Sequence, residues 1–189
     1  MIDKISFRIN SPEGAFGPTL YPNVQVQLST TDKEPLDDPG MNPLTNTFAD
    51  NIGDDVKTVF EGNLVLSALN CVDRPCPFDV MIPLQENFMY DPANGNLLFD
   101  IRIPECPELG QFVPSFDLAT NFPTKVSIAW DNEVDSGTAF TVSGTGLVTQ
   151  FRFFVPRNVP TLSEWGLIAM AGVLGIIGLM AIRRRKVTS

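Results

Sequence analysis

The chain has 189 residues, with 22 acidic and 13 basic side chains and no histidine. Residues 1–156 hold 8 of the Lys and Arg and 21 of the Asp and Glu, a net charge of −13, which excludes nucleic acid as a partner because its phosphates would be repelled. The absence of histidine excludes Ser-His-Asp and Cys-His catalysis, the HExxH metalloprotease motif and most zinc sites.

Up to residue 156, the sequence predicts short β-strands. Apolar and polar side chains alternate with a period of two, as Val24, Val26 and Leu28 do within 23–30. Clusters of Pro, Gly, Asn and Asp separate the segments and predict turns. In chain order the seven predicted strands are 4–10, 23–30, 59–69, 78–84, 97–103, 125–131 and 146–155. This pattern predicts an all-β fold, an antiparallel β-sandwich, with a jelly roll as one arrangement within that class.

One segment of the body departs from the strand pattern. Residues 45–53, TNTFADNIG, are expected to be briefly helical. Thr45 or Asn46 would be the N-cap, because Thr and Asn side chains accept hydrogen bonds from the first free N–H groups of a helix.

Three cysteines lie in proline-flanked loops. Cys71 and Cys76 enclose four residues, and Cys106 lies in PECPE. The C-x4-C spacing is not a metal motif, and outside the cytoplasm a disulfide is favoured. Cys71–Cys76 is the first expectation because the loop between them is short; Cys106 paired with either of the others is the alternative.

Acidic turns raise the hypothesis of a calcium site. Calcium requires six to eight oxygen ligands, and no EF-hand spacing occurs in this sequence. Turn geometry explains the same Asp and Asn residues equally well, so no metal ligand is assigned and no cofactor is expected. The residues considered are Asp37, Asp38, Asp50, Asp54, Asp55, Asp91, Asn94 and Asn96.

Paired carboxylates are the remaining route to catalysis, since glycosidases need only two. With 21 acidic residues in the body, a pair can always be found, and solvated loop charges are the simpler interpretation. There is also no glycine-rich phosphate loop. The sequence therefore predicts a protein that is not an enzyme.

The C-terminal region has a different composition. Residues 165–182 form a run of 18 uncharged residues without proline, which as a helix would be roughly 27 Å long, close to the thickness of the hydrocarbon core. Trp165 lies where an interfacial aromatic residue is expected. A basic cluster follows, so the positive-inside rule places residues 183–189 in the cytoplasm and the body on the other side of the membrane. The cluster comprises Arg183, Arg184, Arg185 and Lys186.

The segment VPTLSEWG, 159–166, followed by an apolar helix and a basic cluster, resembles the IPTL-CTERM sorting signal. That signal is related to the PEP-CTERM signals read by exosortases in Gram-negative bacteria. Val159 replaces the Ile of the family pattern. The resemblance implies a transient anchor that a sorting peptidase cuts near the motif; the alternative is a permanent tail anchor. The matching residues are Val159, Pro160, Thr161, Leu162, Trp165 and Gly166.

Three stretches of the body, 47–67, 88–101 and 146–151, are similar to blocks in a group of PEP-CTERM-bearing envelope proteins. The resemblance implies an exported protein that is first anchored in the inner membrane facing the periplasm and is then located at the cell surface or secreted. It implies nothing about a ligand. The predicted parts are a body over 1–156, a linker with the motif over 157–164, a transmembrane helix over 165–182 and a basic tail over 183–189.

Export requires an N-terminal signal peptide, and MIDKISFRIN has no apolar h-region. We therefore expect the leader to be encoded upstream of Met1. A leaderless tail-anchored protein facing the cytoplasm is the alternative, but the sorting motif would have no use there.

Two function classes remain. The first is a structural protein of the cell surface or extracellular matrix. The second is a binding module, with extracellular polysaccharide as its most plausible partner. Sugars stack on exposed aromatic rings, and the body offers Trp130, Tyr21 and Tyr90. Because Trp130 ends an apolar strand, it is expected to belong to the core.

Overall fold

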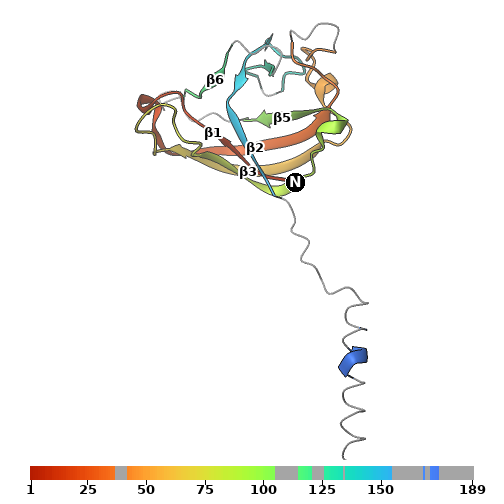
Figure 1. Ribbon diagram of the computed structural model, residues 1–189. Helices are drawn as coiled ribbons and strands as arrows, with labels where there is room; N and C mark the ends of the chain where they lie inside the picture. Colours follow the sequence, from red (N-terminus) through yellow and green to blue (C-terminus); the bar gives the residue numbers. More distant parts are fainter. Residues whose placement is uncertain are drawn as a thin grey trace, which may run out of the picture. The chain divides into compact units, whose positions relative to one another are not determined.

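The computed structural model describes most of the body and a few residues of the tail. The chain divides into two compact units, Met1–Phe154 and Val155–Ser189, and every strand among the described residues belongs to the first (Figure 1). The described residues are 1–36, 42–104, 115–120, 126–133, 135–154, 168 and 171–174.

The first sheet joins the two ends of the body. Strand β1 (Ile2–Phe7) lies between β10 (Thr149–Phe153) and β4 (Val80–Phe88), and both pairs are antiparallel. The register shifts between Ile2 and Lys4 on both sides of β1. This bulge allows Ile2 and Ile5, three positions apart, both to be completely buried.

The second sheet is centred on β2 (Phe16–Thr31), which runs antiparallel to β3 (Lys57–Ala68) on one side and to β5 (Asn96–Arg102) on the other (Figure 1). The pairing of β2 with β3 shifts register three times along its length. At one shift Gly62 has a φ of +133°, a backbone conformation that favours glycine.

Short elements complete the body. Three are single 3-10 turns: η1 (Pro12–Gly14), η2 (Phe48–Asn51) and η3 (Pro92–Asn94). Two are two-stranded antiparallel sheets. These pair β6 (Leu118–Ala119) with β9 (Gly146–Leu147), and β7 (Ile128–Trp130) with β8 (Thr141–Ser143).

The predicted helix over 45–53 is present as the 3-10 turn η2 alone. Its N-cap residue is Thr47, not Thr45 or Asn46, and Thr47 makes no side-chain capping bond. The buried side chain of Asn51 instead accepts a hydrogen bond from Thr45 N (2.8 Å) and donates one to Thr45 O (2.9 Å). The Asn51 side chain, at the end of the turn, therefore takes both hydrogen bonds of the Thr45 backbone, and Thr45 does not start a helix.

Both large sheets contribute to one hydrophobic core. Phe7 of β1 contacts Phe99 of β5 across the two sheets, with ring centroids 5.7 Å apart, and also contacts Phe116 at 5.9 Å. The prediction of an all-β antiparallel body is confirmed. The buried members are Ile2, Ile5, Phe7, Ile9, Phe16, Tyr21, Val24, Val26, Leu28, Val59, Phe60, Leu64, Leu66, Ala68, Cys76, Val80, Ile82 and Phe88.

Each of the seven predicted strands overlaps an observed one. The last prediction, 146–155, corresponds to two strands in different sheets: β9 pairs with β6, and β10 pairs with β1. The chain changes sheet at Val148, whose N–H donates to Asp117 O (3.0 Å). The sequence analysis did not predict β6 and β8, which have two and three residues.

Candidate functional site

The last strand of the body returns the chain to its first residue. Phe154 N donates to Met1 O (2.7 Å), and the Met1 amino group donates to Phe154 O (3.1 Å). Beside them, Arg152 donates two hydrogen bonds to the Asp3 carboxylate, at 2.7 and 2.8 Å. These bonds hold the pKa of Asp3 below its ordinary value. The C-terminal segment therefore begins directly after a strand that is fixed to β1.

The predicted sorting residues lie outside the described part of the chain. The tail residues that are described, 168 and 171–174, are helical, and the side chains of Ile168, Val173 and Leu174 are exposed. Among the residues described, no helix is both long enough and apolar enough to cross a membrane. The predicted span over 165–182 stays a prediction. The motif and basic residues concerned are Val159, Pro160, Thr161, Leu162, Trp165, Gly166, Arg183, Arg184, Arg185 and Lys186.

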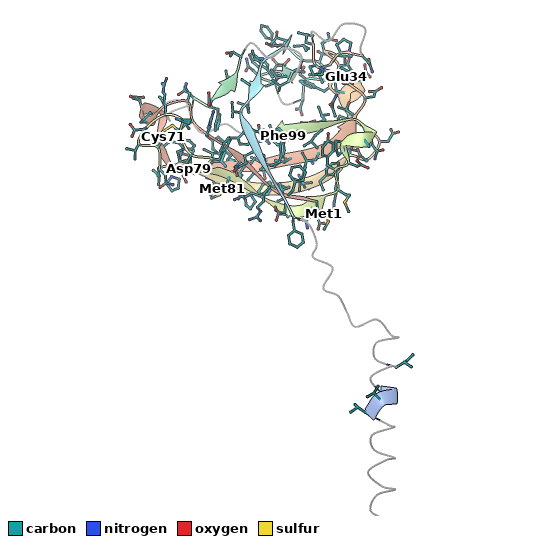
Figure 2. All side chains as sticks on the ribbon, in the orientation of Figure 1. Met1, Glu34, Cys71, Asp79, Met81 and Phe99 are labelled. Atoms are coloured by element: carbon teal, nitrogen blue, oxygen red, sulfur yellow. A yellow bond between two sulfur atoms is a disulfide. The ribbon has the colours of Figure 1, made fainter. Side chains whose placement is uncertain are left out.

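Cys71 and Cys76 form a disulfide, which is the first of the pairings expected from the sequence. The loop between them projects into solvent, with Val72 80% exposed. Asp79 fixes the base of this loop, because its Oδ2 accepts hydrogen bonds from the backbone N–H groups of Leu69 (3.1 Å) and Asn70 (3.0 Å). Cys71 and Asp79 lie at the end of the body away from Met1 (Figure 2). Cys106 is outside the described residues.

The prediction that Trp130 belongs to the core is wrong. Its side chain is 40% exposed, and its ring packs against Phe140, which is 75% exposed, with centroids 5.8 Å apart. The backbone holds the pair together, because Phe140 N donates to Trp130 O (2.9 Å). The sequence analysis missed Phe140. This residue directly precedes β8, the strand that pairs with the strand of Trp130, and that position is the signal that could have indicated it.

The other two candidate aromatics have structural roles. Tyr21 is buried in the core. Tyr90 donates its hydroxyl hydrogen to Gly95 O (3.0 Å), and Gly95 has a φ of +139°. Of the three aromatic residues weighed from the sequence, Trp130 is the one that presents a ring to solvent as part of an exposed pair.

The acidic residues considered for calcium are distributed among separate turns. Asp55 Oδ1 accepts a hydrogen bond from Thr30 N (2.6 Å), and Asp91 Oδ1 accepts one from Ala93 N (3.0 Å) at the start of η3. In the described ranges, no three Asp, Glu, Cys or His side chains are grouped as metal ligands would be. Asp37 and Asp38 lie outside these ranges.

One shallow cavity of about 220 Å³ opens beside β5. Glu34, Asn96 and Ser127 line it together with apolar side chains such as Leu97. The polar groups bond within the protein: Asn96 Nδ2 donates to Glu34 Oε2 (3.0 Å), and Ser127 Oγ accepts from the backbone N–H of Leu36 (2.7 Å). Among the described residues that line this cavity, no nucleophile is hydrogen-bonded to a base.

Comparison with known protein families gives one result, and it concerns the tail. Residues 159–185 match the model of the IPTL-CTERM motif. The chain carries an IPTL-CTERM sorting signal. This PEP-CTERM-like signal begins five residues after Phe154, and it indicates an exported protein that associates with the membrane and is processed by a sorting protease. No curated protein and no solved structure matches the chain.

Proposed function

We propose that this chain is an exported, non-enzymatic protein of the cell surface or extracellular matrix, delivered through a transient membrane anchor. The observation that carries the proposal is the IPTL-CTERM match over 159–185, joined to a body that has a hydrophobic core of its own. The body would be a two-sheet sandwich, because both three-stranded sheets contribute to that core.

Each part of the tail has a physical role in this proposal. The apolar run over 165–182 forms the transmembrane helix, with Trp165 at its outer interface. The basic residues 183–186 stop translocation and stay in the cytoplasm, so the body faces the periplasm. An exosortase-type peptidase then cuts near Pro160–Thr161, where Pro160 disfavours helical geometry at the preceding residue. The acidic body is released to the exterior.

The non-enzymatic part of the proposal is supported by the chemistry of the described body. Asp55 and Asp79 accept hydrogen bonds from backbone N–H groups in turns, and Asp3 is paired with Arg152. The polar groups that line its cavity bond to one another and to the backbone. Catalysis by a carboxylate pair would require two carboxyl groups facing a common space.

The experiment compares isogenic hosts with and without the matching sorting peptidase. With the peptidase, we expect the extracellular protein to have an intact mass that lacks the tail. Replacing Pro160, Thr161 or Trp165 should cause uncut precursor to accumulate in the membrane, whereas Ser163→Ala, between them, should be processed normally. Full-length protein as the sole species in both hosts would overturn transient anchoring and support a permanent tail anchor.

A second candidate function is carbohydrate binding, which the exposed Trp130–Phe140 pair favours. Aromatic rings present large, rigid apolar surfaces at low entropic cost, and such surfaces suit the C–H faces of sugars. A glycan array probed with the protein, followed by Trp130→Ala and Phe140→Ala, tests this function. Phe153→Ala is the control, since Phe153 is an exposed aromatic residue on a different sheet. Absence of binding would favour the purely structural role.

A further inference from the structure

We infer that the end of the body at which the tail begins is a lipid-facing surface while the precursor is anchored. We call this surface the exit rim and define it by Met1, Met89, Phe153 and Phe154. The inference rests on the proposed membrane anchor, and it adds a second contact between the protein and the membrane, made by the body itself.

The strand register assembles the first half of the rim. In β1, Ile2 lies opposite Phe153 of β10. One residue further toward the end of the sheet, Met1 and Phe154 exchange two backbone hydrogen bonds, at 2.7 and 3.1 Å. Phe153 and Phe154 therefore occupy the last two rows of this sheet, beside the first residue of the chain.

The second half comes from the other neighbour of β1. Ile2 also lies opposite Phe88 of β4. This is the last pair of the β1–β4 ladder. Met89 directly follows Phe88, the last residue of β4, so Met89 lies at the same end of this sheet as Met1 and Phe154.

The side chains of the rim are large and apolar; that of Met1 is half-buried and the other three are exposed. Met89 is 70% exposed, Phe153 56% and Phe154 50%. In the preceding row Ile2 and Phe88 are buried in the core, and Phe153, opposite Ile2 on the outer strand β10, is the exposed member of that row. Large apolar side chains gathered at one place on a surface mark an interaction site more often than isolated ones do. Phe and Met are also suited to the boundary between headgroups and acyl chains.

The short tether between body and anchor favours the lipid surface as the partner. Ten residues, 155–164, separate Phe154 from Trp165, so even a fully extended tether reaches only about 35 Å. The tether also starts within the rim itself, because Phe154 is a rim residue. When Trp165 lies at the interface, the rim is the part of the body to which the tether is attached, and a contact between rim and lipid is within the tether's reach.

The charges next to the rim are compatible with lipid. Arg152 is paired with Asp3 at 2.7 Å. The Lys57 ammonium is paired with Glu86 at 3.3 Å and also donates to Asn87 O, two residues before Met89. The net negative charge of the body would repel an anionic surface at long range, but these two ion pairs cancel locally, and the Met1 ammonium, which donates to Phe154 O (3.1 Å), can face the phosphate of a lipid headgroup. A zwitterionic lipid surface therefore suits the rim.

Methionine oxidation tests the inference with an internal control. The full chain is reconstituted in phosphatidylcholine nanodiscs and treated with chloramine-T, a charged oxidant, and sulfoxide formation is followed by mass spectrometry. The same body, released by limited trypsin cleavage after Arg157, is the reference. Met81 is the control: it is 46% exposed and lies toward the Cys71 end of the body, away from Met1 (Figure 2).

We expect oxidation of Met89 to be slowed about five-fold or more in nanodiscs relative to the released body, because oxidation follows exposure. Oxidation of Met81 should be unchanged. The Phe153→Ser/Phe154→Ser variant should restore the oxidation of Met89 in nanodiscs, whereas Phe140→Ser, which alters an exposed Phe of the β7–β8 sheet region, should not. Thermal unfolding of each variant checks that the body remains folded.

Three outcomes would overturn the inference. Equal oxidation of Met89 in nanodiscs and in the released body would show that lipid does not cover the rim. Equal protection in both would show that a second copy of the chain covers it. Protection that survives the double substitution would show that the two Phe side chains do not carry the contact. Removal of the chain from the membrane by a carbonate wash would instead contradict the proposed anchor. Failure of the anchor can therefore be told apart from failure of the rim inference.

Discussion

The side-chain amide of Gln85 makes both backbone hydrogen bonds of Glu61. Gln85 Nε2 donates to Glu61 O (3.0 Å), and Gln85 Oε1 accepts from Glu61 N (3.1 Å). Glu61 belongs to β3, at one edge of the second sheet, and Gln85 belongs to β4, at one edge of the first. The Gln85 amide therefore satisfies the outward-facing N–H and C=O of Glu61, as the backbone of a neighbouring strand would. It also connects the two sheets, which share a hydrophobic core but no backbone hydrogen bonds between β3 and β4.

Replacing Gln85 with Ala should destabilise the body by about 1 kcal/mol, the net value of a typical hydrogen bond. It should also promote aggregation, because an edge with free N–H and C=O groups can pair with another chain. Urea denaturation and light scattering measure the two effects. Gln150→Ala is the matched control: Gln150 is exposed on β10 and, within the described residues, makes no side-chain hydrogen bond. Equal behaviour of the two variants would contradict the role assigned to Gln85.

Leu28 and Leu20 are on the same strand, β2, but differ in burial. Leu28 is completely buried, whereas Leu20 is 52% exposed. We expect Leu28→Ala to lower the free energy of unfolding by about 2–5 kcal/mol, because it leaves a cavity in the core. Leu20→Ala should change it by less than about 0.5 kcal/mol. Circular dichroism in urea compares them, and similar losses would mean that the core is not where the two sheets place it.

Period-two alternation located the strands wherever one face of a strand is buried, as it is for Val24, Val26 and Leu28. It missed the first half of β2, because Pro18 and Pro22 look like turn residues. The register shifts beside each of these prolines, which is how a strand accommodates a residue that has no N–H group. A local sequence pattern contains no information about such a bulge, since the partner strand defines it.

The candidate sites also divide into those that a local sequence pattern reveals and those that depend on contacts between distant segments. The sorting signal was predictable because it is a linear motif, in which sequence order alone carries the pattern. Trp130 was assigned to the core because its strand is apolar, yet β7 has three residues and, in the part of the chain that the structure describes, pairs with β8 alone. The exit rim was not predicted either, because it depends on the register that places both Phe153 and Phe88 opposite Ile2. Contacts between distant segments decide both cases.

The Cys71–Cys76 disulfide should stabilise the body by about 2 kcal/mol, the chain-entropy estimate for closing so short a loop. The Cys71→Ser/Cys76→Ser variant is therefore expected to unfold at a lower urea concentration. Reductant should shift the wild-type protein to the same midpoint and leave the variant unchanged. Asp79 would still hold the base of the loop, so both forms should refold. A wild-type midpoint that does not respond to reductant would show that the disulfide contributes nothing.

The Asp100 carboxylate on β5 is largely buried, and the attraction of a nearby cation offsets only part of the cost of burying its charge. Its side chain is 22% exposed, and the nearest cation, Arg102, is 3.9 Å away. Burial raises the pKa of Asp100 above its ordinary value of 3.8, and Arg102 opposes this shift only in part. The folded protein thus binds the proton more tightly than the unfolded chain. Stability falls as the pH rises from 3.8 through the folded-state pKa, and the penalty is complete above it.

Asp100→Asn removes this ionisation while keeping the shape of the side chain. We expect the variant to have a higher Tm than wild type at pH 7, and the difference to shrink as the pH falls through the folded-state pKa toward 3.8, because both side chains are then neutral. Asp73→Asn, at an exposed position in the disulfide loop, is the control and should differ from wild type by less than about 0.5 kcal/mol at pH 7. Thermal unfolding across this pH range measures all three proteins. A Tm difference for Asp100→Asn that stays constant with pH would mean that packing, not desolvation of the carboxylate, separates the two proteins.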